Sequence, residues 1–147
     1  MTGRIRLELI TPAEEDNAPI PNLSLATVAA LTPPDVEISF SDDLINPLDL
    51  NGGLKGVDLV GISCSTKTVL RAYQIAHAYR ERGIPVVMGG IHPTALPDEA
   101  VEHCDAVVVG EVSKVKLFDV ISRQEIMQML AFEEERHVLV VMTDMTN

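Results

Sequence analysis

Short aliphatic runs, separated by polar or helix-like segments, form the main pattern along this chain of 147 residues. Runs of neighbouring apolar positions are typical of strands buried on both faces of a parallel sheet. The pattern predicts five strands, at residues 4–10, 35–40, 57–63, 84–88 and 105–109. The first alternates weakly, and the third is apolar on both faces except for Asp58 near its start. A sixth run, at residues 137–142, predicts a strand at an edge or an interface, which we expect to join its own sheet rather than that of a second copy.

Helical periodicity occupies most of the gaps between these runs. We expect helices at residues 23–31, 66–82 and 97–102, and a charged, Met-rich helical stretch at 113–136. In the 66–82 helix, Ser65 or Thr66 can cap the start and Gly83 can end it in a left-handed conformation. Strands that alternate with helices favour right-handed crossovers. The predicted fold class is α/β: a doubly wound, Rossmann-like or flavodoxin-like parallel sheet of five strands, with a candidate sixth C-terminal strand and helices on both faces.

Composition and charge narrow the classes of function. Hydrophobic residues make up 46% of the chain, and Trp is absent, which favours an aliphatic core. The net charge of −11 makes this an acidic protein that would repel nucleic acid and anionic membrane surfaces. No apolar run approaches the roughly 18 residues that a membrane helix needs. Cys64 and Cys104 are the only cysteines, and no signal peptide is recognised, so we expect reduced thiols in the cytoplasm.

The candidate chemistry follows the third, fourth and fifth predicted strands. The carboxyl ends of parallel strands meet at one edge, which is where open α/β sheets bind ligands. Hydroxyls and free amides there suit a phosphodiester or a ligand amide, and a glycine pair leaves a slot for close approach. The candidate cofactor-binding residues are Ser63, Ser65, Thr66, Gly89, Gly90, His92, Thr94, Gly110 and Glu111.

Each of these residues also has a purely structural interpretation. Ser65 or Thr66 can cap a helix, the glycines can form a tight turn, and Thr94 can cap the next short helix. His92, in a glycine-rich loop, can bond a backbone carbonyl instead of a ligand or metal. Dinucleotide and Walker A glycine motifs are absent from the chain. Two glutamates, Glu99 and Glu102, are expected on a solvated helix face.

Three blocks of the sequence carry a family resemblance: Asp58-Leu59-Val60-Gly61-Ile62-Ser63, Gly89-Gly90-Ile91-His92-Pro93-Thr94 and Val109-Gly110-Glu111. With their flanking residues, they resemble the cobalamin (B12)-binding domain at the N-terminus of radical S-adenosylmethionine enzymes. The resemblance extends from about residue 4 to 111. It implies a cobalamin-binding domain at residues 1–112, followed by a helix-plus-strand extension at 113–147 that departs from the family.

The resemblance also implies where the cofactor lies. The corrin ring would sit over the carboxyl edge of the sheet, and the nucleotide tail would enter a slot between loops lined by the candidate residues above. Cobalamin domains of the methionine synthase type carry an Asp-x-His-x-x-Gly motif after the first strand, whose His binds the lower face of cobalt. Residues 11–22 contain no His, so cobalt is expected to lack that lower ligand here, as the resemblance implies for this subgroup. The Cys-x-x-x-Cys-x-x-Cys motif is also missing, so we expect no iron–sulfur cluster within this chain and a radical S-adenosylmethionine domain or protein as partner.

Three hypotheses for function follow. The first is a cobalamin-binding module that is not catalytic alone and serves methyl transfer or radical chemistry with a partner; whether the chain belongs to an enzyme stays open. The alternative is a cofactor-free interaction or regulatory domain that keeps the fold and forms a homodimer or a complex through residues 138–142. The least favoured is an enzyme that uses Cys64 as a nucleophile.

Overall fold

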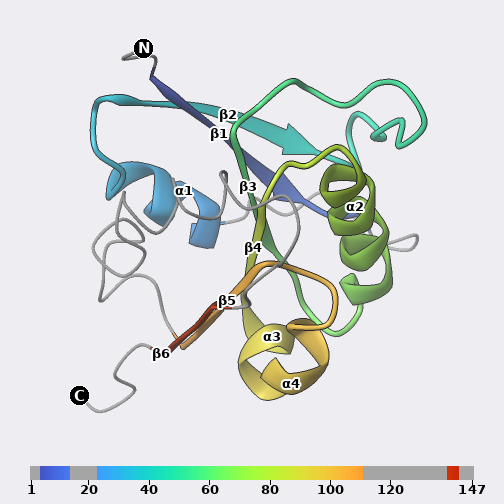
Figure 1. Ribbon diagram of the computed structural model, residues 1–147. Helices are drawn as coiled ribbons and strands as arrows, with labels where there is room; N and C mark the ends of the chain where they lie inside the picture. Colours follow the sequence, from blue (N-terminus) through green and yellow to red (C-terminus); the bar gives the residue numbers. More distant parts are fainter. Residues whose placement is uncertain (1–3, 14–22, 111–138, 143–147) are drawn as a thin grey trace.

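The computed structural model describes residues 4–13, 23–110 and 139–142, which form one parallel sheet flanked by helices (Figure 1). The strands are β1 (Ile5–Thr11), β2 (Val36–Asp42), β3 (Leu59–Ser63), β4 (Val86–Gly89), β5 (Ala106–Val109) and β6 (Leu139–Met142). The helices are α1 (Leu23–Ala30), α2 (Val69–Glu81), α3 (Ile91–Ala95) and α4 (Pro97–Ala100).

The strand order is β2-β1-β3-β4-β5-β6. All neighbouring pairs are parallel, so the predicted doubly wound α/β fold is confirmed. The first five strands have the flavodoxin-like order, in which the chain winds outward to one side of β1 and then to the other. The switch point between β1 and β3 and the carboxyl ends of the strands therefore define the edge where a ligand is expected.

The sixth strand joins the sheet of its own chain, as predicted. It pairs in parallel with β5, with Ala106 opposite Leu139 and Val109 opposite Met142. The predicted helical stretch at 113–136 and residue Glu111 lie outside the described residues.

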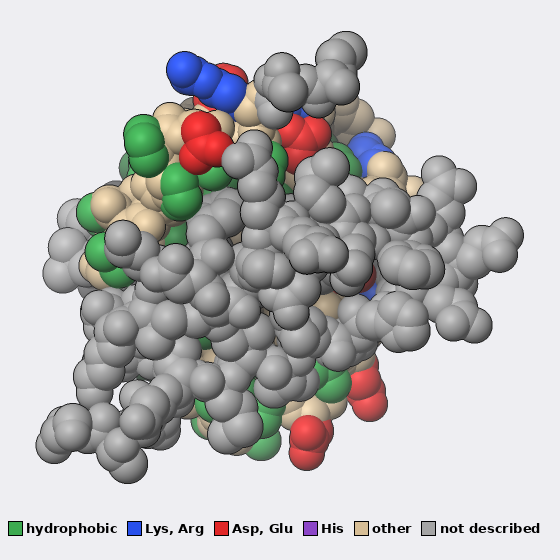
Figure 2. Space-filling model, turned by 60° about the vertical axis from the view of Figure 1, so that its left-hand side comes forward, with side chains coloured by type: hydrophobic (Ala, Val, Ile, Leu, Met, Phe, Trp, Pro, Cys, Tyr) green, Lys and Arg blue, Asp and Glu red, His purple; other side chains and the backbone are tan. Residues whose placement is uncertain are grey.

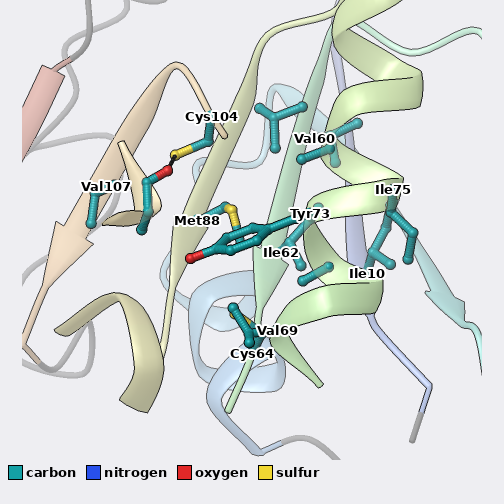
Figure 3. Close-up of a cluster of buried hydrophobic side chains, with 14 of the residues drawn as sticks. Ile10, Val60, Ile62, Cys64, Val69, Tyr73, Ile75, Met88, Cys104 and Val107 are labelled. Atoms are coloured by element: carbon teal, nitrogen blue, oxygen red, sulfur yellow. Dashed lines mark hydrogen bonds between the residues drawn. The ribbon is translucent and has the colours of Figure 1, made fainter. Parts of the chain in front are cut away.

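Two hydrophobic clusters cover opposite faces of the sheet. On one face, Leu25 and Val28 of α1 pack with Leu7 and Leu9 of β1. On the other face, α2 packs on β3 and β4, and Figure 3 shows Tyr73 of α2 lying over this second cluster. The alternation of side chains along each strand sends neighbouring residues into different clusters. Helices on both faces are thus explained by strands that are apolar on both sides.

Two local predictions were wrong. The His-Pro-Thr segment, expected to be a loop, is the short helix α3. Proline is tolerated there because Pro93 lies in the first turn, where its nitrogen has no helical partner. The start of α2 is the second correction, because its N-cap is Thr68 and no side chain caps it. The Thr68 hydroxyl instead accepts a hydrogen bond from the Ser65 backbone N–H at 3.0 Å.

On the face shown in Figure 2, the acidic side chains that can be seen lie at separate places around the margin of the view. None of the helices in the described part of the chain is long and apolar enough to cross a membrane.

Candidate functional site

The ends of β3, β4 and β5 bring most of the candidate residues together at the carboxyl edge. Ser63 at the end of β3 is the register partner of Gly89 at the end of β4. Thr94 of α3 reaches the end of β5, where its Oγ1 accepts a hydrogen bond from the Gly110 N–H at 3.1 Å. Thr94 was predicted to cap α4, but α4 has no side-chain cap. The Thr94 hydroxyl instead links α3 to the end of β5.

Gly90 is required by the protein's own backbone. Its φ is +108°, a left-handed value that residues with a side chain rarely adopt. A Cβ at this position would lie 2.6 Å from the Cys64 carbonyl oxygen and 3.2 Å from Ser63 Oγ. The turn after β4 therefore lies directly against the end of β3, and this contact and the positive φ together account for the glycine.

Gly89 is less constrained than its neighbour. A Cβ there would meet Val108 Cβ at 3.7 Å, which is an ordinary van der Waals distance. A glycine at this position is therefore demanded neither by backbone conformation nor by lack of space.

Among the candidate residues that the structure describes, His92 is the most enclosed, with only 4% of its surface exposed. Its Nδ1 lies 3.2 Å from Thr66 Oγ1, and its Nε2 lies 2.8 Å from Glu99 Oε1. His92 is therefore not a loop residue bonded to a backbone carbonyl, as one prediction had it. Both ring nitrogens already have partners within the protein, which leaves neither of them free for a metal.

Glu99 is exposed, as the sequence pattern predicted, with 46% of its side chain accessible, and it also belongs to the same cluster. The carboxylate accepts hydrogen bonds from His92 and, at 2.8 Å, from the Tyr73 hydroxyl. These bonds, with that from His92 the largest, lower the pKa of Glu99 below its ordinary value. Burial together with the Glu99 hydrogen bond raises the pKa of Tyr73. The spacing of seven residues between His92 and Glu99 was the available signal, because α3 and α4 stack those residues on one side.

Tyr73 joins this cluster to a second imidazole. Its ring stacks on that of His103, with centroids 3.8 Å apart and an angle of 13° between the planes. The same tyrosine meets His92 edge-on at 6.3 Å. The His103 ring thus packs against the side of the cluster formed by Tyr73, His92 and Glu99.

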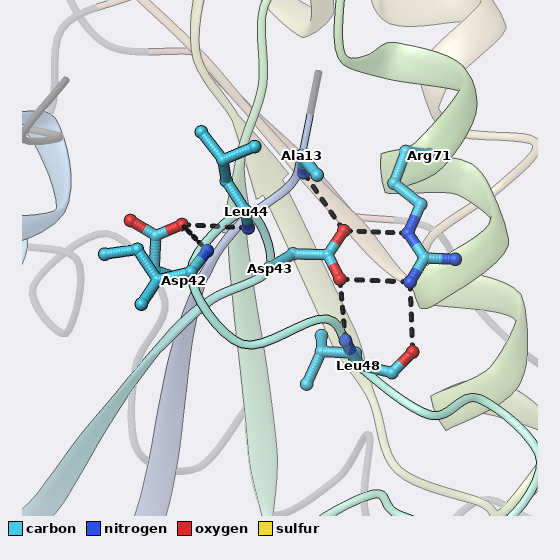
Figure 4. Close-up of polar contacts among 7 residues, drawn as sticks. Ala13, Asp42, Asp43, Leu44, Leu48 and Arg71 are labelled. Atoms are coloured by element: carbon cyan, nitrogen blue, oxygen red, sulfur yellow. Dashed lines mark hydrogen bonds and ion pairs between the residues drawn. The ribbon is translucent and has the colours of Figure 1, made fainter. Parts of the chain in front are cut away.

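A second polar cluster lies at the switch point, beside the ends of β1 and β2 (Figure 4). The buried Asp43 carboxylate receives Arg71 Nε at 2.7 Å and Arg71 Nη2 at 3.0 Å. It also accepts from the backbone N–H groups of Ala13 and Leu48 at 3.0 Å and 2.8 Å. Burial would raise the pKa of Asp43, but these hydrogen bonds and the Arg71 charge outweigh it and lower the pKa. We call this set of bonds around Asp43 the Asp43 clamp. It fixes Ala13, which follows β1, and no pattern in the sequence indicated it.

Cys64 is unsuited to act as a nucleophile. Its side chain is buried at 4% exposure, and burial raises the pKa of its thiol to about 12. A thiol in this state has almost no reactive thiolate at neutral pH. Within the described ranges, no group of three His, Cys, Asp or Glu side chains is placed to hold a metal ion.

Comparisons with known proteins give the family. Residues 18–116 match the family described as the B12 binding domain. The chain is 35% identical over 103 residues to bacteriochlorophyllide d C-8(2)-methyltransferase of Chlorobaculum tepidum. The aligned region covers 69% of this chain and 22% of that protein. The chain is 35% identical over 96 residues to the C-12(1)-methyltransferase of the same organism, covering 63% of this chain and 20% of that protein.

A third relative is an uncharacterized methyltransferase of Pyrococcus horikoshii, 30% identical over 115 residues, or 70% of this chain and 25% of that protein. The chain spans about a fifth of the length of the first two relatives. No solved structure gives a significant match.

The residues at the carboxyl edge fit cobalamin. The vitamin has neutral amide arms and a phosphodiester tail, and the edge offers neutral hydroxyls on Ser63, Thr66 and Thr94 beside the small residue Gly89. Such groups bond amides and phosphate without a large desolvation cost. Cobalamin is accordingly the cofactor of this domain, and the chain belongs to the family of B12 binding domains.

Proposed function

We propose that this chain is the cobalamin-holding module of a radical S-adenosylmethionine methyltransferase and has no catalytic activity alone. The observation that carries the proposal is the meeting of Ser63, Thr66, Gly89 and Thr94 at one sheet edge in a chain that matches B12 binding domains. When bound, cobalamin supplies a cobalt centre that can carry a methyl group.

The chain's own residues would hold the periphery of the cofactor. We assign the hydroxyls of Ser63, Ser65, Thr66 and Thr94 to its polar groups. The proposed site is completed by Gly89, Gly90, His92, Gly110 and Glu111. For His92 the proposed role is indirect, because Thr66 and Glu99 occupy its two ring nitrogens. Cobalt would then receive no imidazole from this residue.

A partner is needed for any chemistry. The two Chlorobaculum relatives are methyltransferases by name, and the matched region is about a fifth of each. The chain has two cysteines, both buried in the structure, which are too few for the three-cysteine motif that holds an iron–sulfur cluster. We propose that a radical S-adenosylmethionine domain or protein supplies the cluster and the substrate site.

Two further assignments belong to this proposal. We place the end of the cofactor domain near residue 112, which is supported by the end of the family match at residue 116. The extension at 113–147 still contributes β6 to the same sheet. A cytoplasmic location is supported by Cys64 and Cys104, which are both free thiols.

The second candidate function is a cofactor-free docking domain that forms a homodimer or a complex. Large apolar side chains at the carboxyl edge favour it: Leu70 of α2 is 76% exposed, Ile91 of α3 75%, and Leu96 between α3 and α4 49%. Large apolar side chains that stay exposed can form part of an interaction surface.

The decisive experiment mixes the full chain with hydroxocobalamin and separates bound from free by gel filtration. The proposal expects corrinoid absorbance to elute with the protein in a one-to-one ratio. A Ser63→Val, Thr94→Val double variant should retain less, whereas Thr32→Val, which alters a hydroxyl at the far end of α1, should retain as much as wild type. Protein that elutes as a dimer free of corrinoid would support the docking function instead.

A further inference from the structure

Thr66, His92 and Glu99 form one hydrogen-bonded row at the carboxyl edge of the sheet. Thr66 Oγ1 lies 3.2 Å from His92 Nδ1, and His92 Nε2 lies 2.8 Å from Glu99 Oε1. Thr66 is exposed at the outer end of the row, and His92 is buried in its middle. The backbone adds a further tie, since the His92 N–H points at the Cys64 carbonyl oxygen at 3.4 Å. The buried His92 ring therefore fixes the position of the exposed Thr66 hydroxyl.

The direction of these bonds follows from what each group can donate. An ionised carboxylate only accepts, and the hydrogen bonds to Glu99 favour its ionised form. The hydrogen between His92 and Glu99 must then sit on Nε2. In the neutral ring the other nitrogen, Nδ1, has no hydrogen and accepts one. Thr66 is left as the donor to His92.

A threonine hydroxyl has one hydrogen, and with the His92 ring in this tautomer that hydrogen points to Nδ1. What Thr66 can still offer to a ligand is an oxygen lone pair, which accepts a hydrogen bond. A phosphate oxygen is also an acceptor, so the two would face each other without a hydrogen between them. An amide N–H is a matching partner.

We infer that His92 and Glu99 are positioning residues that turn Thr66 into a hydrogen-bond acceptor for a side-chain amide of the corrin ring. The inference deepens the proposed function and rests on it. It separates Thr66 from the groups that would hold the phosphodiester tail, although all of them lie on the same edge.

The first test needs no ligand and reads the imidazole directly. In the full chain labelled with nitrogen-15, long-range proton–nitrogen correlation spectra at neutral pH should show His92 with hydrogen on Nε2 and none on Nδ1. Glu99→Ala should give a mixture of the two neutral forms, while Glu102→Ala, which removes an exposed glutamate from the next turn, should not. A wild-type ring that is protonated on Nδ1, or on both nitrogens, overturns the inference.

The second test compares two corrinoids by absorbance titration. Hydroxocobalamin has both the amide arms and the phosphodiester tail, and aquahydroxocobinamide has the amide arms without the tail. Thr66→Val should weaken binding of both by a similar factor, about three- to tenfold, which is the usual worth of one neutral hydrogen bond. Thr66→Ser should restore most of the loss, and Thr32→Val should match wild type.

The outcomes separate the inference from the proposed function. Loss confined to hydroxocobalamin would place Thr66 on the tail, and no loss with either corrinoid would remove it from the site; each overturns the inference while cobalamin binding stands. Wild-type protein that binds neither corrinoid overturns the proposed function and, with it, the amide contact. The imidazole spectra decide the bond directions in every case.

Discussion

At the residue scale, two adjacent glycines at the end of β4 have different reasons to be there. Gly90 combines a positive φ with a close approach to the backbone of Cys64, whereas Gly89 has ordinary space around it. The sequence motif predicted a pair of glycines that open a slot for a ligand. The structure contradicts the prediction for Gly90, because the space beside it is filled by the end of β3, whereas Gly89 has ordinary space.

This difference makes a prediction for stability. Gly90→Ala should lower the free energy of unfolding by about 2 kcal/mol or more, because the added Cβ is strained in φ and meets backbone atoms that cannot move aside. Gly89→Ala should change it by less than about 1 kcal/mol, because its Cβ meets Val108 at 3.7 Å. Urea unfolding of both variants measures the difference. Equal losses would contradict the assigned contact between the β4 turn and Cys64.

The two tyrosines of α2 provide a second comparison. The Tyr79 hydroxyl donates to the fully buried carboxyl of Glu8, which also accepts from Ser41 Oγ at 2.5 Å. Tyr79→Phe leaves a buried acceptor short of a partner and should cost about 1–3 kcal/mol of unfolding free energy. Tyr73→Phe removes a bond to the exposed Glu99 and should cost less than about 1 kcal/mol. Chemical denaturation of the two variants measures both losses of unfolding free energy. A larger loss in Tyr73→Phe than in Tyr79→Phe would contradict the prediction.

At the scale of elements, the sequence predicted what depends on long local patterns. The strands were found as short apolar runs and α2 by the helical period of its apolar residues, and Gly83 follows the end of α2 with φ +75° as expected. Helix α3 was missed because it is five residues long and contains Pro93, so no periodicity distinguishes it from a loop. The N-cap of α2 was misplaced because Thr66 and Thr68 bond to His92 and Ser65, and such partners are visible only in three dimensions.

The Asp43 clamp joins three elements and makes stability depend on pH. Its pKa is lowered in the folded protein, so its contribution is present above the ordinary value of 3.8 and is lost as the pH falls through the folded pKa. Between about pH 5 and 2, the unfolding free energy of wild type should fall more steeply than that of Asp43→Asn. Urea titrations across this range give both slopes.

The Asp43→Asn variant should also be less stable at neutral pH, by about 2 kcal/mol or more, because Arg71 loses its charged partner. Asp49→Asn is the control, since this aspartate is exposed in the same connection after β2. It should leave the pH dependence close to that of wild type. A slope unchanged by Asp43→Asn would show that the clamp does not set acid stability.

At the scale of the whole molecule, the order of the strands decides which residues meet. Ser63, Gly89 and Gly110 are far apart in the sequence, and only the order β3-β4-β5 brings the three strand ends together. Alternating strands and helices were sufficient to predict a parallel sheet with a ligand edge. They could not reveal the links from Asp43 to Arg71 or from His92 to Glu99, because those pairs depend on the packing of α2, α3 and α4 on the finished sheet.

Binding at this edge should stabilise the whole fold. A ligand that binds only the folded chain adds stability in proportion to the logarithm of its free concentration over Kd, about 2.7 kcal/mol at a hundredfold excess over Kd. For a chain of this length, that corresponds to a rise in Tm of roughly 5–10 °C. Thermal unfolding followed by circular dichroism, with increasing hydroxocobalamin, should show this rise. Thr66→Val should need about three to ten times more corrinoid for the same shift, because it loses one hydrogen bond to the ligand. A wild-type Tm that does not move at saturating corrinoid would mean that the edge binds no cofactor and would favour the docking function.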